Sequence, residues 1–541
     1  MSEALGRRLG IVVGGSLTGG LQVKLDSGTP IEEMAVGRYV VIEGQQSHFF
    51  GMINDVKLGT IDQQFAITPP DVSDSFISEV IAGTSTYGVI DVVPMLCISG
   101  DVKTILEGPQ PVKTIPAHFS EVREATEQDV ELVFGTEDER HFHVGTPLDM
   151  ETKVCLNIDE FVKRSNGVFG KSGTGKTFFT RLLLIGMVQK GVAANLIFDM
   201  HNEYGWEGTF EGGARKVKAL KPLFSSKVAL FTLDEESARR RKASTDYVVQ
   251  IGYDEIQPED IALLQDTLNL TQPAVEAVYQ LAREFGYGRW LQSFFELGSE
   301  DETRELLDRL RIHESTYRNL HRGMEKLRRL SFLVPHAPDN SVKRILEYLD
   351  RGMNVVLEFG RYTDVTAYVL VANILTRRIY DQYRDRTEAA LAEDKARPRP
   401  LVITIEEAHK FLSPSVAEQT IFGTIAREMR KYNVTLLVID QRPSGIDDEV
   451  MSQLGTKVTY LLDNEKDIDS VLMGASGKSQ LKTVLSKLEA KQQALIFGHA
   501  LPMPVVIKTR DYGSAESYKE FGFMDAAELK RKSEKEIEGL F

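Results

Sequence analysis

Residues 170–177 of this 541-residue chain read Gly170-Lys171-Ser172-Gly173-Thr174-Gly175-Lys176-Thr177. In the pattern G-x-x-x-x-G-K-T, glycines allow the backbone to wrap a polyphosphate so that several N–H groups point toward it. Lys176 is then within reach of the β and γ phosphates, and the hydroxyl of Thr177 is placed to bind Mg²⁺. The apolar run 178–188 predicts a helix whose positive N-terminal end faces the phosphates. We therefore assign Phe178, together with the loop residues, to nucleotide binding. This stretch therefore predicts a site for ATP or GTP.

The composition is that of a globular chain with several domains. Its length allows three or four domains, each with its own core. The net charge of −15 argues against a surface coated with nucleic-acid-binding charge but permits a local basic patch or pore. Two cysteines, Cys97 and Cys155, cannot build a disulfide framework, which favours a reducing compartment. Because we find neither a signal-peptide core nor a membrane-spanning apolar run, we expect a soluble cytoplasmic protein with no membrane partner.

Changes in the sequence pattern divide the chain into five parts. Residues 1–115 carry short β-prone runs between glycine, serine and proline turns, which predict an all-β barrel that serves as an assembly or partner module. Residues 116–254 and 351–512 predict the two halves of an α/β core. Residues 255–350 carry leucines at helical spacing and predict an inserted helical bundle whose charged residues form solvated faces. Residues 513–541 predict a tail that either docks on a neighbour or is frayed.

A second motif follows the continuous apolar strand expected at 401–405. The strand ends in two adjacent carboxylates, Glu406 and Glu407. A nucleotide hydrolase needs such a pair opposite its phosphate loop, because one carboxylate holds the hydrated Mg²⁺ and the next polarises the attacking water. We therefore assign Glu406 to the metal and Glu407 to water activation.

Further candidates lie at the carboxyl ends of other expected strands, where ligands bind in open α/β sheets. Asp199, His201 and Glu203 follow one such strand, and the alternative is a polar loop with incidental charge. Gln441 follows the strand expected at 434–439 and is placed to sense the γ-phosphate.

Three arginines are also candidates. Arg427 and Arg430 lie on an expected helix and either supply positive charge to a neighbouring subunit's nucleotide or form a salt-bridged helix surface. Arg164, six residues before the loop, is expected close to the nucleotide.

The motifs, in their order along the chain, resemble those of the HerA family of hexameric DNA-translocating ATPases, which are related to FtsK. The matching segments are GKSGTGKT at 170–177, FDMHNEY at 198–204, VITIEEAH at 402–409, AREMRKY at 426–432 and DQRPSGIDDEV at 440–450. The resemblance implies an N-terminal β-barrel, a RecA-like core with a helical insertion, and a C-terminal tail that braces the next subunit. One position departs from the pattern, because Glu406 stands where many relatives have aspartate, although a carboxylate is kept.

The resemblance implies a homohexameric ring with ATP and Mg²⁺ at the subunit interfaces and duplex DNA threaded through the pore. It implies that Arg430, or else Arg427, reaches in from the neighbouring subunit and that Arg164 assists. The residues that would serve one subunit's own nucleotide are those of the loop, with Lys176 and Thr177, and Glu406, Glu407 and Gln441.

The implied activity is that of an ATP-driven double-stranded DNA translocase or helicase. Relatives work with the nuclease NurA in DNA end processing, and bacterial relatives pair with sirtuin-type or other effectors in antiphage defence. One alternative is an ATP-binding ring scaffold that assembles and activates an effector, with hydrolysis in a regulatory role. Another is a protein-remodelling ATPase, which the segment 441–444 and the expected barrel argue against.

Overall fold

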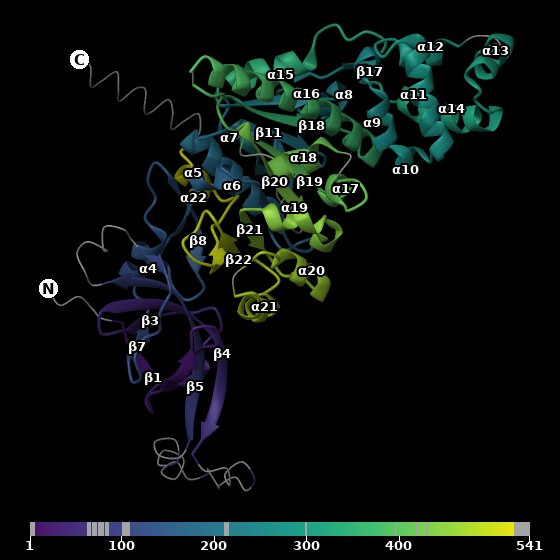
Figure 1. Ribbon diagram of the computed structural model, residues 1–541. Coiled ribbons are helices and arrows are strands. Elements are labelled where there is room, and N and C mark those ends of the chain that lie inside the picture. Colours follow the sequence, from purple (N-terminus) through teal and green to yellow (C-terminus); the bar gives the residue numbers. More distant parts are fainter. Residues whose placement is uncertain are drawn as a thin grey trace, which may run out of the picture. The chain divides into compact units, whose positions relative to one another are not determined.

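The structure is a computed structural model and describes residues 6–61, 67, 73, 81, 86–99, 109–209, 216–297, 300–394, 396–417, 420–428, 431–475 and 477–523 (Figure 1). The chain forms two compact units. The first unit is drawn from residues 1–161, 169–175 and 455–510, and the second from residues 162–168, 176–454 and 511–541.

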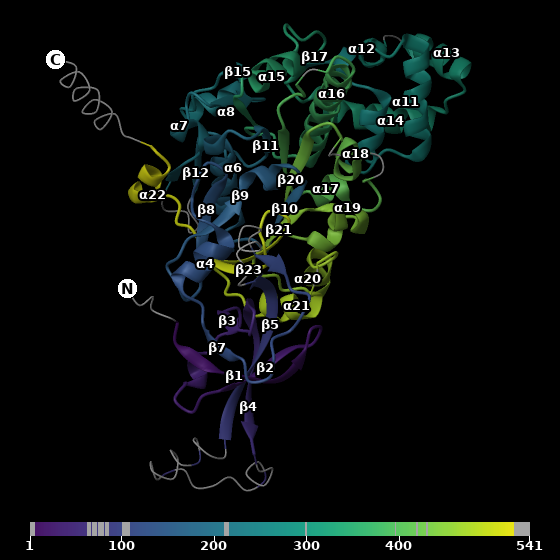
Figure 2. The ribbon, with the colours of Figure 1, turned by 60° about the vertical axis from the view of Figure 1, so that its left-hand side comes forward.

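The first unit begins with a closed antiparallel barrel. Its strands follow the order β2-β1-β7-β3-β4-β5, β5 pairs back to β2, and β6 joins the outer edge of β5. The longest strands, β4 and β5, pair along their whole length (Figure 2). The bounds are β1 (Arg8–Ser16), β2 (Gly20–Leu25), β3 (Tyr39–Glu43), β4 (Ser47–Thr60), β5 (Thr86–Ser99), β6 (Gln110–Pro111) and β7 (Glu121–Glu124), with the short helix η1 (Ile31–Glu33) after β2. Alternate side chains fill the interior, among them Val23, Val40, Ile53, Ile90 and Val92, which are all fully buried.

An antiparallel sheet in the order β21-β22-β23-β8-β9 completes the first unit. Its strands are β8 (His141–Pro147), β9 (Val154–Asn157), β21 (Thr456–Thr459), β22 (Gln493–Gly498) and β23 (Val505–Thr509). The accompanying helices are α4 (Glu127–Phe134), α5 (Ile158–Val162), α20 (Glu465–Val471) and α21 (Lys478–Ser486). The sheet is tied to the barrel because the Val506 N–H donates to the buried hydroxyl of Tyr39 at 3.2 Å.

The second unit is built on a parallel sheet. Strands β15-β14-β18-β11-β19-β20 pair in parallel, and β10 lies beside β20. Every residue of β11, β18, β19 and β20 is buried, as expected for strands covered on both faces. The bounds are β10 (Asn166–Phe169), β11 (Ala194–Asp199), β14 (Val228–Thr232), β15 (Tyr247–Val248), β18 (Asn354–Glu358), β19 (Leu401–Glu406) and β20 (Val434–Asp440).

Helices pack on this sheet, with α6 against β11, α15 against β18 and α18 against β20 (Figures 1 and 2). They are α6 (Lys176–Lys190), α7 (Leu220–Leu223), α8 (Glu235–Arg240), α15 (Ser341–Asp350), α16 (Val365–Ala392), α17 (His409–Leu412), α18 (Ile421–Glu428), α19 (Asp448–Gln453) and α22 (Ala515–Glu520). The minor elements are β12 (Glu207–Thr209), β13 (Lys216–Lys218), β16 (Ile251–Gly252), β17 (Leu333–Val334), η2 (Tyr253–Glu255) and η4 (Pro443–Gly445). Within the described residues, no helix combines the length and the apolar character needed to cross a membrane.

A helical bundle is inserted between β16 and β17. It contains α9 (Pro258–Leu263), α10 (Gln265–Leu268), α11 (Gln272–Phe285), α12 (Trp290–Glu296), α13 (Glu300–Leu310) and α14 (Glu314–Arg328). The pairing of Ile251 with Leu333 holds the two ends of the insertion together. In its core Trp290 is fully buried, and its indole N–H donates to the Ile256 carbonyl at 2.8 Å. The predicted fold class, an α/β core with an inserted helical bundle and an N-terminal all-β barrel, is confirmed.

Buried polar contacts anchor the bundle on α16. Asp260 of α9 is 1% exposed, and its carboxylate accepts hydrogen bonds from Arg377 at 3.0 Å and from Asn373 at 3.2 Å. Arg378 also pairs with Glu255 at the start of the insertion.

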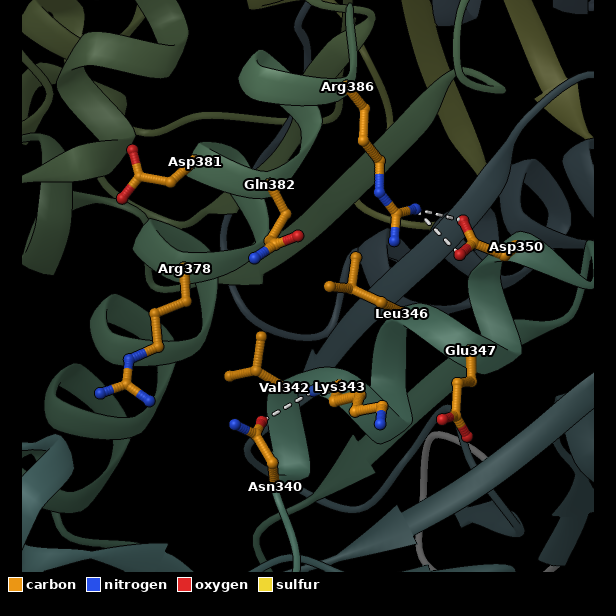
Figure 3. A pocket seen from close by; sticks show the side chains of 10 residues that line it. All are labelled: Asn340, Val342, Lys343, Leu346, Glu347, Asp350, Arg378, Asp381, Gln382 and Arg386. Atoms are coloured by element: carbon orange, nitrogen blue, oxygen red, sulfur yellow. Dashed lines mark hydrogen bonds and ion pairs between the residues drawn. The ribbon is translucent and has the colours of Figure 1, made fainter. Parts of the chain in front are cut away.

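A hollow of about 660 Å³ lies between α15 and α16 (Figure 3). Its charged lining is balanced, with three basic residues (Lys343, Arg378 and Arg386) and three acidic residues (Glu347, Asp350 and Asp381). Arg386 pairs with Asp350 at 2.7 Å, and Arg378 is held by Glu255. The hollow thus contains one ion pair, Arg386–Asp350, that joins the two helices.

The start of the C-terminal tail packs on its own chain. The Tyr512 hydroxyl donates to the Lys218 carbonyl, and the Lys218 N–H donates to the Tyr518 hydroxyl at 2.9 Å. Gln189 of α6 donates to the Phe521 carbonyl at 3.0 Å. Residues 524–541 of the tail lie outside the described residues.

Replacing Trp290 by alanine should selectively loosen the bundle. Loss of a fully buried tryptophan costs about 3–5 kcal/mol, which corresponds to at least about a hundredfold in local opening. We expect amide hydrogen exchange in α11 and α14 to accelerate by that factor, while amides of the barrel strands keep their protection. Unchanged exchange in α11 and α14 would contradict the role given to this side chain.

Candidate nucleotide site

The phosphate loop between β10 and α6 is shaped by contacts within the first unit. Gly170 has φ of 147°, and a Cβ there would lie 2.6 Å from the Cβ of Tyr460, so a glycine is required. The Lys171 N–H donates to the Leu461 carbonyl at 3.2 Å, and its ammonium pairs with Asp463 at 3.0 Å. The segment after β21 therefore holds the start of the loop in place.

The remaining loop residues differ in exposure. Ser172 and Gly173 are exposed, whereas Thr174 is buried and its hydroxyl donates to the Lys171 carbonyl at 2.8 Å. Gly173 has φ of 79° and no atom within 4 Å of its Cβ position, which leaves that side of the loop open. In the second unit, Lys176 begins α6 and is buried, and Thr177 is half-buried beside it.

Phe178, which sequence reasoning assigned to the nucleotide, contacts the C-terminal segment of the second unit. Its ring centroid lies 5.8 Å from that of Tyr512 and 5.1 Å from the guanidinium of Arg181. Arg181 is itself fully buried, and its Nε–H donates to the Glu203 carbonyl at 3.0 Å.

Glu406 ends β19 in an enclosed position. Its Oε1 accepts a hydrogen bond from the Tyr204 hydroxyl at 2.9 Å, and its main-chain N–H donates to the Tyr368 hydroxyl at 2.9 Å. Its Oε2 is buried and has no hydrogen-bond partner among the described residues. Burial raises the pKa of Glu406 to about 8. A buried carboxylate oxygen without a donor is suited to a cation or to the water bound to one.

Glu407 and Gln441 are brought together by the ends of neighbouring strands. Glu407 has φ of 48°, a left-handed conformation that non-glycine residues rarely adopt outside functional or tightly constrained positions. The Gln441 side-chain amide donates to Glu407 Oε1 at 2.9 Å. The side chain of Glu407 is only partly buried, so water can reach it.

Two residues that sequence reasoning missed lie against Glu407. The buried Asp440 accepts the main-chain N–H of His409 at 2.7 Å, and its Oδ2 lies 2.9 Å from the Nδ1 of the same histidine. That Nδ1 lies 3.6 Å from Glu407 Oε2. Both residues belong to the motifs 402–409 and 440–450, but the sequence did not indicate that they meet.

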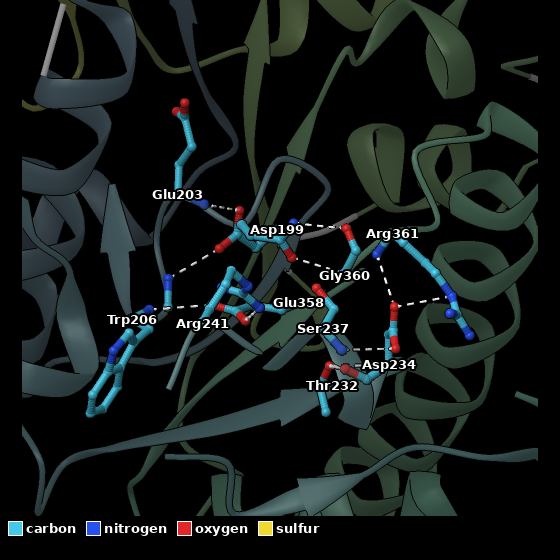
Figure 4. Close-up of polar contacts among 12 residues, drawn as sticks. Asp199, Glu203, Trp206, Thr232, Asp234, Ser237, Arg241, Glu358, Gly360 and Arg361 are labelled. Atoms are coloured by element: carbon cyan, nitrogen blue, oxygen red, sulfur yellow. Dashed lines mark hydrogen bonds and ion pairs between the residues drawn. The ribbon is translucent and has the colours of Figure 1, made fainter. Parts of the chain in front are cut away.

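Asp199 ends β11, and its carboxylate organises the turn that follows the strand (Figure 4). Its buried carboxylate accepts the main-chain N–H groups of Glu203, Tyr204 and Gly205 at 2.7, 2.8 and 3.0 Å. Burial, followed by the negative charges of neighbouring carboxylates, raises the pKa of Asp199. His201 is exposed on the same turn. The turn carries Tyr204 to Glu406, and the tyrosine of the FDMHNEY motif does not by itself indicate this contact.

Glu358 ends β18 in register with Asp199 on β11 and is fully buried. It pairs with Arg241 and accepts the Trp206 N–H at 3.2 Å (Figure 4). The buried carboxylate of Glu358 is thus neutralised by an ion pair.

Two of the three candidate arginines, Arg427 and Arg164, lie within the described residues. Arg427 of α18 pairs with Glu449 of α19 at 3.2 Å. Arg164 precedes β10, is partly buried, and its carbonyl accepts the Asn166 side-chain amide at 2.7 Å. Arg430 lies outside the described residues.

The raised pKa of Glu406 makes a prediction for the protein without nucleotide or Mg²⁺. Because the pKa rises from 4.5 to about 8 on folding, the folded state binds this proton more tightly, and stability falls as pH increases through that window. A glutamine side chain at position 406 is neutral at every pH in this window, so it removes this pH dependence of stability. We expect Glu406→Gln to raise the melting temperature at pH 8 by at least about 2 °C, with the gain shrinking toward pH 5.

Thermal unfolding in EDTA at several pH values measures this difference. Glu276→Gln, at an exposed position on α11, is the matched control and should shift the melting temperature equally little at every pH. A gain from Glu406→Gln that grows toward acidic pH would contradict the assignment.

Two parts of the chain match known protein families. Residues 142–379 match the family described as "Helicase HerA, central domain", and residues 9–104 match the HAS barrel domain. The protein named DNA double-strand break repair helicase HerA from Pyrococcus furiosus is 24% identical over 413 residues, covering 72% of this chain and 73% of that one. Its namesakes from Sulfolobus acidocaldarius and Saccharolobus solfataricus are 23% and 25% identical, covering 94% and 87% of both chains.

Among solved structures, the bacterial conjugative coupling protein TrwB aligns with a TM-score of 0.47 and 13% identity, covering 73% of this chain and 94% of that one. The two family matches follow one another along the chain, and the central-domain match contains the phosphate loop. Residues 142–379 therefore form a HerA-type central domain and residues 9–104 a HAS barrel, and the chain is a P-loop ATPase.

Proposed function

We propose that this protein is an ATP-driven double-stranded DNA translocase or helicase. The observation that carries the proposal is the pair Glu406–Glu407 at the end of β19, with Gln441 bound to Glu407, in a chain that also carries the phosphate loop. The relatives named DNA double-strand break repair helicases align over as much as 94% of this chain, which supports DNA as the substrate along which the protein moves.

In this proposal, the loop and Lys176 hold the phosphates, and Thr177 and Glu406 hold Mg²⁺. The bound ion supplies positive charge to the phosphate oxygens on which negative charge develops. The residues present fit it, because Glu406 offers an enclosed oxygen without a donor among the described residues.

Glu407 positions the attacking water and accepts its proton. Gln441 holds one carboxylate oxygen of Glu407, which fixes the direction in which the other one points. His409, fixed by Asp440, borders the same carboxylate and limits its movement. The constraint on Glu407 is therefore both in its backbone and in its side chain.

The assembly we propose is a homohexamer with nucleotide at its interfaces and duplex DNA in its pore. Arg430 or Arg427 would reach the neighbour's nucleotide, and Arg427 would then have to leave Glu449. The barrel formed by strands β1 to β7 would recruit a NurA-like nuclease, or a sirtuin-type or other effector in antiphage defence. In that setting the chain is the motor of the complex.

Steady-state ATP hydrolysis with and without linear duplex DNA tests the proposal. We expect stimulation by DNA, and we expect Glu407→Gln to lower kcat at least about a hundredfold while nucleotide binding is kept, because only the water-activating group is lost. Glu276→Gln on the exposed face of α11 is the control and should leave kcat unchanged.

Turnover that survives in Glu407→Gln would overturn the catalytic assignment. Hydrolysis indifferent to DNA, together with effector activity that persists in Glu407→Gln, would instead favour the scaffold alternative. Turnover stimulated by a protein substrate and not by DNA would favour the remodelling alternative.

A further inference from the structure

A groove of about 1,280 Å³ runs between α13 and α14 in the inserted bundle. Basic side chains line it, namely Arg304 of α13, Arg318, Arg322 and Lys326 of α14, and Arg329 just after α14. The last four recur at intervals of four, four and three residues. That spacing places them in one row along a single face of the helix. The sequence interpretation had treated these charges as an ordinary solvated face.

The groove carries a local excess of positive charge, although the chain as a whole is strongly acidic. The groove contains five basic side chains and three acidic ones, Asp308, Glu314 and Glu325. Two of the acids already have partners, because Glu314 pairs with Arg318 and Glu325 with Arg328. The local surplus of cations contrasts with a net charge of −15 for the whole chain.

Three of the cations are available to a ligand. Arg304, Arg322 and Arg329 are exposed and form no ion pair in the part of the chain that the structure describes. Lys326 is exposed as well and donates only to the Thr267 carbonyl at 3.2 Å. Solvated guanidinium groups of this kind bind phosphate oxygens through two parallel hydrogen bonds.

The dimensions favour a long polyanion over a small one. From Arg318 to Arg329 the row extends about 16 Å along the helix axis. A strand of duplex DNA presents a phosphate about every 3.4 Å, so a row of this length faces several successive phosphates. A single small anion would engage only one or two of these side chains.

The lining also argues against a protein as the main occupant. The apolar residues that line the groove include Leu307 and Ile312, which are only 6% and 9% exposed. Protein interfaces rely on exposed apolar or aromatic anchors at their centre, and this groove offers few.

We propose that the groove between α13 and α14 binds the phosphate backbone of duplex DNA. This inference rests on the proposed function, because it names the part of the chain that grips the DNA. The contact is independent of base sequence, since it involves only phosphate oxygens. It lies on the inserted bundle, well apart in the sequence from the phosphate loop and the catalytic carboxylates.

The test is equilibrium binding of the full-length protein to fluorescent linear duplex DNA over a series of salt concentrations. The test variant combines Arg304→Gln, Arg322→Gln and Arg329→Gln. The matched control combines Arg239→Gln, Arg240→Gln and Arg283→Gln, three exposed arginines that do not line the groove. A third protein carries lysine at the three test positions, which keeps the charge and checks that folding is intact.

We expect the glutamine variant to bind at least tenfold more weakly, with a plot of log K against log salt that is shallower by about 2 or more, since each phosphate contact contributes about 0.9 to the slope. The control and lysine proteins should keep most of the wild-type slope, and basal ATP hydrolysis should not change. An unchanged slope in the glutamine variant would overturn this inference while leaving the proposed function intact.

Two other outcomes are also decisive. Wild-type protein that neither binds duplex DNA nor is stimulated by it would overturn both the inference and the proposed function. A glutamine variant that keeps its affinity for DNA and its salt dependence, but loses binding to a polyglutamate peptide that wild type retains, would reject DNA in favour of an acidic protein segment.

Discussion

Buried carboxyl groups at the carboxyl ends of three neighbouring parallel strands are the constraint on which the candidate site depends. Glu358, Asp199 and Glu406 end β18, β11 and β19, and an uncompensated buried carboxylate would be strongly destabilising. Each is compensated differently. Glu358 forms an ion pair with Arg241, Asp199 accepts three main-chain N–H groups, and Glu406 accepts the hydroxyl of Tyr204. Only Glu406 keeps a buried oxygen without a donor among the described residues, and that is the position suited to a cation.

Buried carboxylates at strand ends also position the segments around the candidate site. Asp199 collects the N–H groups of the turn that follows β11 and so delivers Tyr204 to the end of β19. Asp440, at the end of β20, takes the first N–H of α17 and holds His409 beside Glu407. In both cases a strand-end carboxylate, buried because the sheet is covered on both faces, fixes the conformation of a neighbouring segment. The sheet therefore determines the geometry of the site directly.

The sequence predicted the fold class, the phosphate loop and the placement of Glu406 and Glu407, because each depends on local pattern and on the rule that parallel strands share one edge. Partners across the fold were not predictable. Tyr204 and Glu406 are 202 residues apart, and nothing local signals their contact. Gln441 was expected near the γ-phosphate, and its hydrogen bond to Glu407 emerges only from the structure. Strands β6 and β7 were not predicted, because β6 has only two residues and β7 is rich in glutamate, so neither has an apolar run. Strand β7 also extends the barrel beyond the predicted boundary at residue 115. The charges of the inserted bundle were interpreted from the sequence as solvated faces, and the groove that α13 and α14 form emerges only from the structure.

Helix α16 connects the end of β19, which carries Glu406, to the inserted helical bundle. The Tyr368 hydroxyl, in the first turn of α16, bonds both the N–H and the carbonyl of Glu406. Farther along α16, Asn373 and Arg377 hold the buried Asp260 of α9. Most of this stretch of helix is buried, and a close-packed interior transmits a displacement more readily than it absorbs one. Tyr368, Asn373 and Arg377 of one continuous helix thus link the end of β19 to the start of the bundle through hydrogen bonds.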